Sequence, residues 1–394
     1  MGADAEHHVS NSLDHRLDRR ELVRRPTIPE LDGLRGIAIL LVFLTHFVAL
    51  YLSPAGSPVD AVVRWVARFG WTGVDLFFVL SGFLITGILL DTRHQPHYWR
   101  NYAARRILRI FPLYYGVLVL AFLVVPLVGH WTSPALETLR SNQAWFWAYA
   151  VNILQVVKGE AATPLNTSHF WSLCIEEQFY IVWPLVILFA SPRGIFRIAF
   201  WAIVLGGVFR VWIVLSPLPT WAAYVLTPGR LDGLMIGAAL AVLARGPGLE
   251  SVRPYAKVVA LGSGLVTLVL ALWRGMGYRD PVVAVVGFPT IAVGFGAALV
   301  LSLTGGLQLK RILSHPHLRA WGKYSYGLYL LHFPILGGVE SMWGKRMAQM
   351  TIAGSHLPGV LVRSMVAVPL AWAAAWASYN LYEKRFLGLK RFFV

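Results

Sequence analysis

Long apolar runs, separated by short polar segments, fill the chain from about residue 36 to residue 382. Ten of these runs are long enough to cross the roughly 30 Å hydrocarbon core of a bilayer as α-helices. They cover residues 36–53, 73–90, 109–128, 171–190, 195–215, 224–244, 256–273, 282–303, 324–339 and 359–382. The pattern therefore predicts an all-α polytopic membrane protein with about ten transmembrane helices.

An eleventh apolar run, WFWAYAVNILQVV, extends from Trp145 to Val157. Its 13 residues include two side-chain amides, and this length is too short for a comfortable crossing. A full crossing would also invert every later loop and weaken the charge bias of the loops. We therefore expect a short re-entrant or interfacial helix in this segment.

The two ends of the chain are polar. Residues 1–30 include the Arg-rich stretch DHRLDRRELVRR, and we expect them to form a disordered cytoplasmic tail. No short apolar region with a small-residue cleavage site precedes the first run, so we expect that run to remain as a span. Residues 31–385 are then a single transmembrane domain, and residues 386–394 are a short cytoplasmic tail.

The composition agrees with a membrane protein, because 57% of the residues are hydrophobic and only 14% are charged. A soluble domain usually carries about 25% charged residues. The net charge of +16 would suggest nucleic-acid binding in a soluble protein. Here most of the 35 Lys and Arg residues lie in alternate short segments between the spans. By the positive-inside rule we expect a multi-pass protein of the inner (cytoplasmic) membrane, with both termini cytoplasmic and no nucleic-acid partner.

The single cysteine, Cys174, allows neither an intramolecular disulfide nor a cysteine-based metal cluster. A free thiol in an apolar helix usually serves packing. No other residues have the spacing of metal ligands, so we expect no metal site.

The first span carries two ionisable residues, Arg35 and His46. Eleven residues of α-helix advance about 16 Å and return to within about 20° of the same face, so both side chains should lie on one stripe. Ionisable residues inside a span are costly and mark a candidate functional site. His46 is a candidate general base, since an imidazole can accept a hydroxyl proton near neutral pH. The alternatives are a structural histidine and, for Arg35, a membrane anchor.

The run HFWSLCIEEQFYIVWPL (His169–Leu185) places polar residues along one helical face. These are His169, Ser172, Glu176 and Tyr180, while Glu177 points about 100° away. Two adjacent carboxylates at the start of a span are difficult to explain by packing, and a cation or histidine from another span would stabilise them. One glutamate could stabilise His46 and the other hold a cation, and the residues leave that assignment open. We expect Ser172 and Tyr180 to position a substrate.

Arg106 and Arg109 lie three residues apart at the inner end of the third span, with Arg105 beside them. This basic face could bind lipid headgroups. It could equally bind the phosphates of a nucleotide-bearing cofactor, because guanidinium groups match phosphate oxygens bidentately.

Several polar residues in other spans are weaker candidates. Asp75 could be solvated at the interface, or it could orient a cation or histidine within the bundle. Arg230 and Asp232 could form a local ion pair or contact a substrate. Tyr326 and His332 lie in a late span, where His332 could also be a structural histidine. We expect Asp75, Tyr326 and His332 to help to position a substrate.

These residues and motifs together resemble a known family. The span from Arg35 to His46, GVDLFFVLSGFLI, the Arg106-x-x-Arg109 pair, WSLCIEEQFY and YSYGLYLLH occur in this order between about residues 28 and 385. They resemble the membrane-bound acyltransferase family three, whose integral-membrane members O-acylate bacterial glycans and macrolide antibiotics. Many relatives carry an extra periplasmic hydrolase-like domain. We expect this chain to be the stand-alone form.

The resemblance implies transfer of an acyl group, usually acetyl, from acyl-CoA to a hydroxyl of a sugar-containing acceptor. The residues that match the family motifs are His46 (the essential histidine), Glu176 and Glu177 (the acidic motif), and Arg35, Arg106 and Arg109 (the arginines). Acetyl-CoA is then an acyl donor bound from the cytoplasm rather than a tightly bound cofactor. We expect Arg105 to extend the donor site.

The resemblance and the residues together suggest direct transfer. CoA phosphates would rest on the arginines, His46 would take the proton of the attacking hydroxyl, and Glu176 by preference would stabilise the imidazolium that forms. The alternatives are O-acylation of a macrolide-like small molecule and proton-coupled transport, which also uses intramembrane His, Glu and Arg. The basic patch argues against transport.

Overall fold

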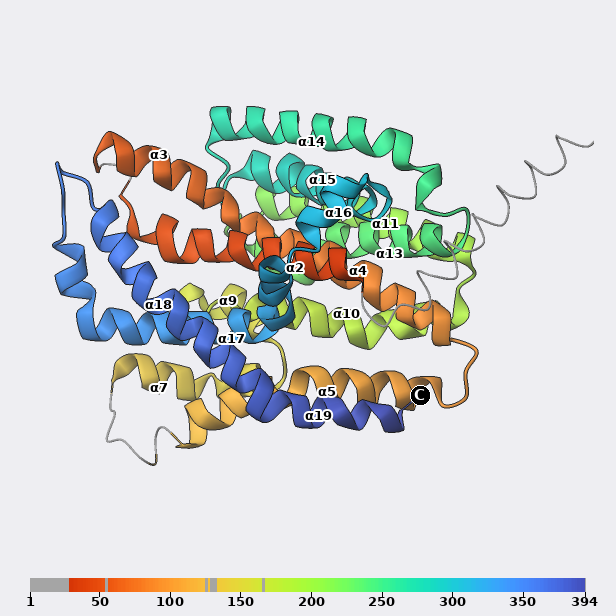
Figure 1. The fold of residues 1–394 in the computed structure, drawn as a ribbon, viewed down its shortest axis with the longest axis horizontal. Helices are drawn as coiled ribbons and strands as arrows, with labels where there is room; N and C mark the ends of the chain where they lie inside the picture. Colours follow the sequence, from red (N-terminus) through yellow and green to blue (C-terminus); the bar gives the residue numbers. More distant parts are fainter. Residues whose placement is uncertain (1–27, 54–55, 125–126, 128–132, 165–166, 394) are drawn as a thin grey trace, which may run out of the picture.

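The computed structural model describes residues 28–53, 56–124, 127, 133–164 and 167–393. The tail predicted over residues 1–30 falls almost entirely outside these ranges, and its last residues begin the first helix at Pro29. Within the described ranges the chain folds into helices joined by short loops (Figure 1). The only β-type pairing there is an isolated bridge between Ile352 and Ser355. The all-α prediction is confirmed.

Ten long helices form the body of the described chain. They are α2 (Pro29–Phe43), α4 (Gly73–Thr92), α5 (Tyr98–Val119), α10 (Phe170–Phe189), α11 (Pro192–Leu215), α13 (Leu231–Arg245), α14 (Arg253–Arg274), α15 (Phe288–Thr304), α17 (Pro316–Ala348) and α18 (Leu357–Ala377). The shorter α-helices are α3 (Pro58–Ala67), α7 (Pro134–Ser141), α8 (Gln143–Trp147), α9 (Val151–Lys158), α12 (Ala222–Val225), α16 (Leu307–Leu313) and α19 (Lys384–Gly388). Turns of π-helix are η1 (Leu44–Val48), η4 (Leu120–Val124), η8 (Val283–Gly287) and η9 (Ser378–Glu383). Turns of 3₁₀-helix are η2 (Ala49–Tyr51), η3 (Arg68–Thr72), η5 (Glu160–Ala162), η6 (Thr227–Arg230), η7 (Leu249–Ser251) and η10 (Leu389–Phe392).

The ten predicted spans fall on the ten long helices or on the turns that continue them. Eight helical stretches of the described chain are long and apolar enough to cross a membrane: Pro29–Tyr51, Pro58–Thr92, Tyr98–Val124, Phe170–Phe189, Pro192–Leu215, Arg253–Arg274, Val283–Thr304 and Leu357–Phe392. The other two predicted spans lie on α13, which has only 15 residues, and on α17, whose apolar run is interrupted by tyrosines and a histidine. The chain is therefore a multi-pass membrane protein.

The run over residues 145–157 forms two short helices rather than the single one predicted. The chain breaks between α8 and α9 at Tyr149, whose φ is +51°. The Gln178 side-chain amide of α10 donates hydrogen bonds to the Tyr149 carbonyl oxygen (3.1 Å) and to Asn152 Oδ1 (3.2 Å). These two bonds tie the broken segment to a long helix, and neither piece is long enough to span a bilayer.

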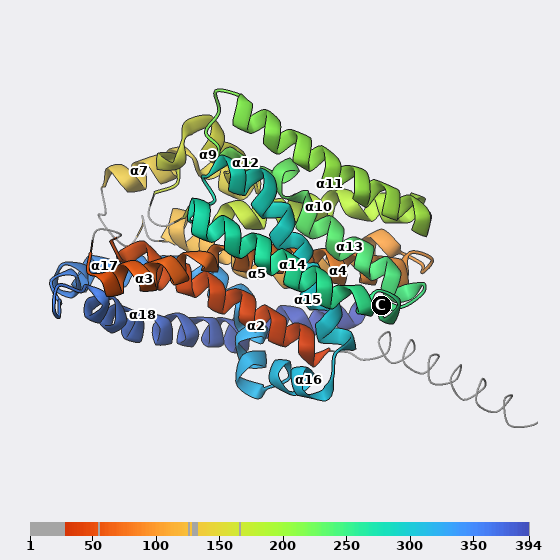
Figure 2. The same cartoon turned by 90° about the horizontal axis from the view of Figure 1, so that it is seen from above.

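Helices α2 and α4 lie side by side in the middle of the bundle (Figures 1 and 2). Helices α13, α15 and α10 pack against α4, while α17 packs against α2 and α18 against α17. Figure 1 shows α14 along one edge of the molecule and α5 with α19 along the opposite edge. The side chains of α2 and α4 are therefore surrounded by other helices on several sides.

Glycines allow the close crossing between α4 and α13. A Cβ atom at Gly82 would lie 2.0 Å from the Leu234 carbonyl oxygen, and one at Gly237 would lie 2.1 Å from that of Val79. Any side chain at these two positions would force the helices apart. Small residues at a crossing are typical of helix packing inside membranes.

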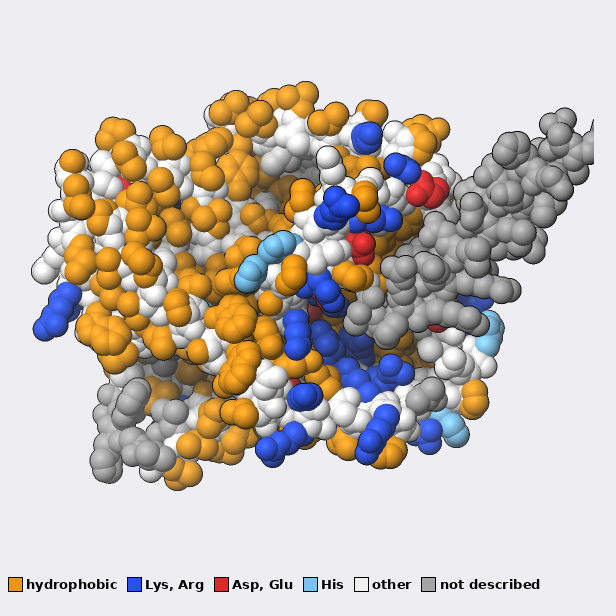
Figure 3. Space-filling model, viewed as in Figure 1, with side chains coloured by type: hydrophobic (Ala, Val, Ile, Leu, Met, Phe, Trp, Pro, Cys, Tyr) orange, Lys and Arg blue, Asp and Glu red, His pale blue; other side chains and the backbone are white. Residues whose placement is uncertain are grey.

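The outer helices α11 and α14 expose apolar side chains along much of their length. Exposed residues on them include Phe200, Trp201, Leu205, Val208, Trp212, Val258, Leu261, Leu265, Leu272 and Trp273. The orange surface over α14 in Figure 3 is part of this apolar exterior. A helix that remains apolar on its exposed face is suited to lipid rather than to water.

A buried charge network lies where α4 meets α11 and α13. Asp75 pairs with Arg230, and both side chains are almost fully buried. Arg210 pairs with Asp232 at 3.0 Å and also donates to the Gly229 carbonyl oxygen at 2.9 Å. Asp75 thus holds a cation within the bundle, which was one of the two roles expected for it, and it does not line the large cavity described below. Arg230 and Asp232 likewise pair across helices and not with each other.

We predict that Asp75→Asn destabilises the protein by about 3–5 kcal/mol, because it leaves the Arg230 guanidinium buried without its counter-ion. Thermal unfolding of the purified protein in detergent measures this loss. Asp91→Asn is the matched control, since the Asp91–Arg245 pair is partly exposed at 33% and 26% and an exposed pair contributes about 1 kcal/mol or less. Equal melting temperatures for the two variants would contradict the prediction.

Candidate active site

A cavity of about 810 Å³ lies among α2, α4, α5, α10, α17 and the C-terminal turns. Seven basic residues line it: Arg35, Arg105, Arg106, Arg109, Arg319, Lys323 and Lys390. Figure 3 shows basic side chains gathered in a hollow of the surface. All four residues predicted to bind a cofactor, Arg35 and the three arginines of α5, therefore line one cavity.

The cavity wall includes residues that the sequence did not single out. Lys390 comes from η10, beyond the last predicted span, and Arg105 Nη1 on α5 donates to the Phe393 carbonyl oxygen at 3.3 Å. The segment predicted as a short tail is thus helical and packed against α5. A basic residue after a last span is also typical of a membrane anchor, so the sequence offered no specific signal for Lys390.

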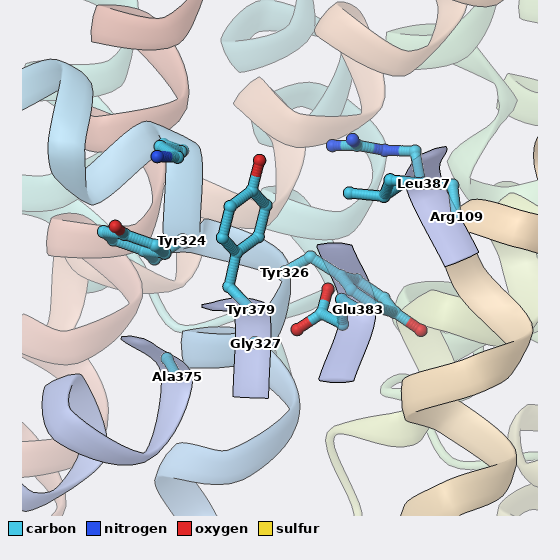
Figure 4. A pocket seen from close by; sticks show the side chains of 9 residues that line it. Arg109, Tyr324, Tyr326, Gly327, Ala375, Tyr379, Glu383 and Leu387 are labelled. Atoms are coloured by element: carbon cyan, nitrogen blue, oxygen red, sulfur yellow. The ribbon is translucent and has the colours of Figure 1, made fainter. Parts of the chain in front are cut away.

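A smaller cleft beside this cavity shares Arg109 with it (Figure 4). Figure 4 shows Tyr326 and Glu383 beside Arg109, together with Tyr324 and Tyr379. The Tyr326 hydroxyl donates to the Ile110 carbonyl oxygen at 2.8 Å, which fastens α17 to α5. Tyr326 lines both spaces, and its hydroxyl proton is already donated to the backbone.

Three members of the polar stripe predicted on α10 line the cavity: Ser172, Glu176 and Tyr180. Glu177, which was predicted to point about 100° away from them, lines it as well, whereas His169 does not. Ser81 on α4 donates to Glu176 Oε1 at 2.7 Å, and the Tyr180 hydroxyl donates to Ser81 Oγ at 3.1 Å. The Arg106 guanidinium lies over the Tyr180 ring, 5.6 Å from its centroid. Cations, carboxylates and hydroxyls from three helices are therefore combined in one wall.

Ser172 and Tyr329 form the part of the wall that leads to the histidines. Their hydroxyls are 2.5 Å apart, and the Tyr329 hydroxyl also lies 3.1 Å from the His169 carbonyl oxygen. The His332 ring is centred 5.8 Å from the Tyr329 ring and 5.1 Å from the His169 ring. Tyr329 lies inside the YSYGLYLLH motif, but its position beside Ser172 and the histidines results from the packing of α17 against neighbouring helices.

His46 lies next to this wall but does not line the cavity. Its Nδ1 is 2.9 Å from His332 Nε2, and the two rings are nearly parallel with centroids 5.0 Å apart. The residue is half-buried. The prediction that Arg35 and His46 share one stripe assumed a regular α-helix, whereas the chain changes to π-helix at Leu44. The regular spacing on which that prediction depended therefore does not extend to His46.

Two contacts bear on the roles predicted for Glu176 and His46. The Glu176 carboxylate accepts from Ser81, and the ring of His46 lies next to that of His332. His332 is fully buried, does not line the cavity and contacts His46. Despite the proximity of three histidines, the described residues contain no group of His, Cys, Asp or Glu arranged to hold a metal ion.

Comparison with known proteins adds independent findings. Residues 28–378 match the model of a family described as an acyltransferase domain. The peptidoglycan O-acetyltransferase OatA of Listeria monocytogenes is 30% identical over 331 residues, which cover 79% of this chain and 50% of that protein. The O-acetyltransferase OatA of Staphylococcus aureus is 29% identical over 335 residues, covering 80% and 52%.

A further relative is the putative peptidoglycan O-acetyltransferase YrhL of Bacillus subtilis, 29% identical over 330 residues that cover 78% of this chain and 48% of that protein. The chain spans about half the length of these curated relatives. No solved structure matches it.

We predict that Lys390→Gln weakens the binding of inorganic pyrophosphate about tenfold, because it removes one cation from the wall of the basic cavity. Binding of radiolabelled pyrophosphate to the purified protein measures the change. Lys384→Gln is the matched control, since Lys384 precedes Lys390 by six residues, is exposed and does not line the cavity. The same loss in both variants would mean that net charge, and not the place of Lys390, sets the affinity.

Proposed function

The chain belongs to the membrane-bound acyltransferase family three, and from this premise we propose that it transfers an acetyl group from acetyl-CoA to a hydroxyl of a glycan. The observation that carries the proposal is a cavity with seven basic residues whose wall reaches Ser172 and Tyr329, beside His332 and His46. The relatives named as peptidoglycan O-acetyltransferases favour a cell-wall glycan over a macrolide-like acceptor.

The basic residues support acyl-CoA as the donor. Coenzyme A carries several phosphates, and guanidinium and ammonium groups bind phosphate through charge-assisted hydrogen bonds. A volume of about 810 Å³ lies within the range of pockets that enclose a large organic ligand. The phosphates would rest on Arg105, Arg106, Arg109 and Lys390, and the uncharged pantetheine arm would extend toward Ser172.

His46 would act as the general base. The acceptor O–H bond breaks as its proton passes to the imidazole, and the oxygen forms the new ester bond with the thioester carbonyl carbon. The C–S bond then breaks, and the leaving sulfur takes the proton from His46, which gives free coenzyme A. The reaction needs no further reactant.

The position of His46 outside the cavity wall gives the two substrates different routes. The acetyl end of the donor would approach the imidazole beside the hydrogen-bonded pair of Ser172 and Tyr329. The acceptor would approach His46 from its half-exposed side. With the donor bound from the cytoplasm and both termini cytoplasmic, acyl groups would enter from inside the cell.

We expect His46→Ala to reduce acetyl transfer about 100-fold or more, because a positioned general base contributes roughly 10²–10⁴ to the rate. The assay supplies membranes with radiolabelled acetyl-CoA and a soluble muropeptide and counts the labelled product. His94→Ala, at an exposed histidine after α4, is the control and should keep normal transfer. Undiminished transfer by folded His46→Ala protein would refute the role of His46.

We expect Arg106→Ala combined with Arg109→Ala to abolish the thermal stabilisation that acetyl-CoA gives to the purified protein. A ligand at 100 times its Kd stabilises the folded state by about 2.7 kcal/mol, which is readily detected as a rise in melting temperature. The matched control removes two exposed cations of α14 that lie outside the cavity, Arg253 and Lys257. If acetyl-CoA raises the melting temperature of the Arg106→Ala/Arg109→Ala variant as much as that of the wild type, the basic cavity does not bind the donor.

A further inference from the structure

His332 occupies a fixed position in the middle of α17. It is fully buried, and its Nδ1 lies 2.6 Å from the Tyr329 carbonyl oxygen and 3.0 Å from that of Leu328. A carbonyl oxygen can only accept a hydrogen bond, so Nδ1 of His332 must carry the proton. The backbone of α17 thus selects one tautomer of this ring.

The second ring nitrogen of His332 is consequently an acceptor. The ring packs between Phe43 and Phe333, with centroids 5.3 Å and 4.7 Å away, and burying a charge in such surroundings is costly. A neutral imidazole with a proton on Nδ1 has its lone pair on Nε2. That nitrogen is 2.9 Å from His46 Nδ1, which must therefore be the donor of the bond between the two rings.

We infer that His332 is a positioning residue that holds His46 in its Nδ1–H tautomer and leaves Nε2 of His46 as the base. The inference rests on the proposed function, in which His46 takes the proton of the acceptor hydroxyl. Two backbone carbonyls orient His332, His332 orients His46, and the lone pair of His46 Nε2 is directed away from this chain of bonds. A neutral histidine here orients the imidazole of the general base, as the aspartate does in a Ser-His-Asp triad.

The surroundings of His46 hold the ring in this geometry. Its plane is inclined by only 11° to that of His332, and Phe333 packs 4.2 Å from its centroid. The residue sits in the π-helical turn η1, an irregularity that changes the direction of a side chain relative to the preceding α-helix. When His46 accepts a proton on Nε2, its Nδ1–H remains bonded to His332, so the imidazolium is formed without rearrangement.

The test compares two amide substitutions of one residue. In His332→Gln the amide reaches the position of Nε2, so its oxygen can accept from His46 Nδ1. In His332→Asn the amide stays at the position of Nδ1 and can donate to the backbone carbonyls but cannot reach His46. We expect His332→Asn to lower kcat about 100-fold with an unchanged KM for acetyl-CoA, and His332→Gln to stay within about tenfold of the wild type.

The outcomes separate this inference from the proposed function. Normal kcat in His332→Asn, or equal losses in the two amide variants, overturns the role of His332. If the His332→Asn protein loses both its activity and its thermal stabilisation by acetyl-CoA, the defect lies in donor binding. That result also overturns the positioning role of His332. An active His46→Ala protein would instead refute the proposed function. Nitrogen NMR of ¹⁵N-histidine in the unmodified protein gives a further test that needs no folded variant, since a proton on Nε2 of His46 contradicts the inference.

Discussion

Polar groups inside this bundle must find partners within the protein, because hydrocarbon offers them none. The structure meets this constraint in two ways. Between α4, α11 and α13 the charges cancel one another: Asp75 with Arg230 and Arg210 with Asp232 are nearly fully buried and enclosed. Between α2, α10 and α17 the polar groups instead form hydrogen-bonded chains that reach the wall of a cavity. The first arrangement fixes how helices pack, and the second leaves chemically useful groups near a space that a ligand can enter.

The cavity wall offers two kinds of group to a ligand. Its basic residues come from α2, α5, the start of α17 and η10. Ser172 and Tyr329 offer neutral hydroxyls in the same wall. An acyl-CoA molecule has the matching distribution, with phosphates at one end and an uncharged thioester at the other. In the proposed reaction the phosphates stay on the basic residues, and the neutral thioester and acceptor hydroxyl approach His46.

Local departures from regular helix geometry shape the site. The π-helical turn at His46 breaks the register that an unbroken α-helix would keep with Arg35, and the left-handed Tyr149 divides the segment that braces α10. Both departures lie in segments whose amino acids show no obvious helix breaker. Irregular turns of this kind frequently occur at functional positions, where packing against neighbouring elements compensates for the weaker local geometry.

The sequence by itself determined the class of the fold and much of the cavity wall. The thickness of the bilayer sets the length of an apolar run, so the long helices could be located from the sequence. Helical periodicity placed Ser172, Glu176 and Tyr180 on the face that lines the cavity, but it did not predict that Glu177 lines it as well. Only the tertiary structure decided which helices are neighbours. The bond between His46 and His332 joins residues 286 positions apart, and the pair of Asp75 with Arg230 joins residues 155 apart. The tertiary structure also brings Lys390 into the cavity wall. Periodicity describes the faces of a single helix, whereas partnership between faces depends on the packing of several helices at once, and no pattern along one chain contains that information.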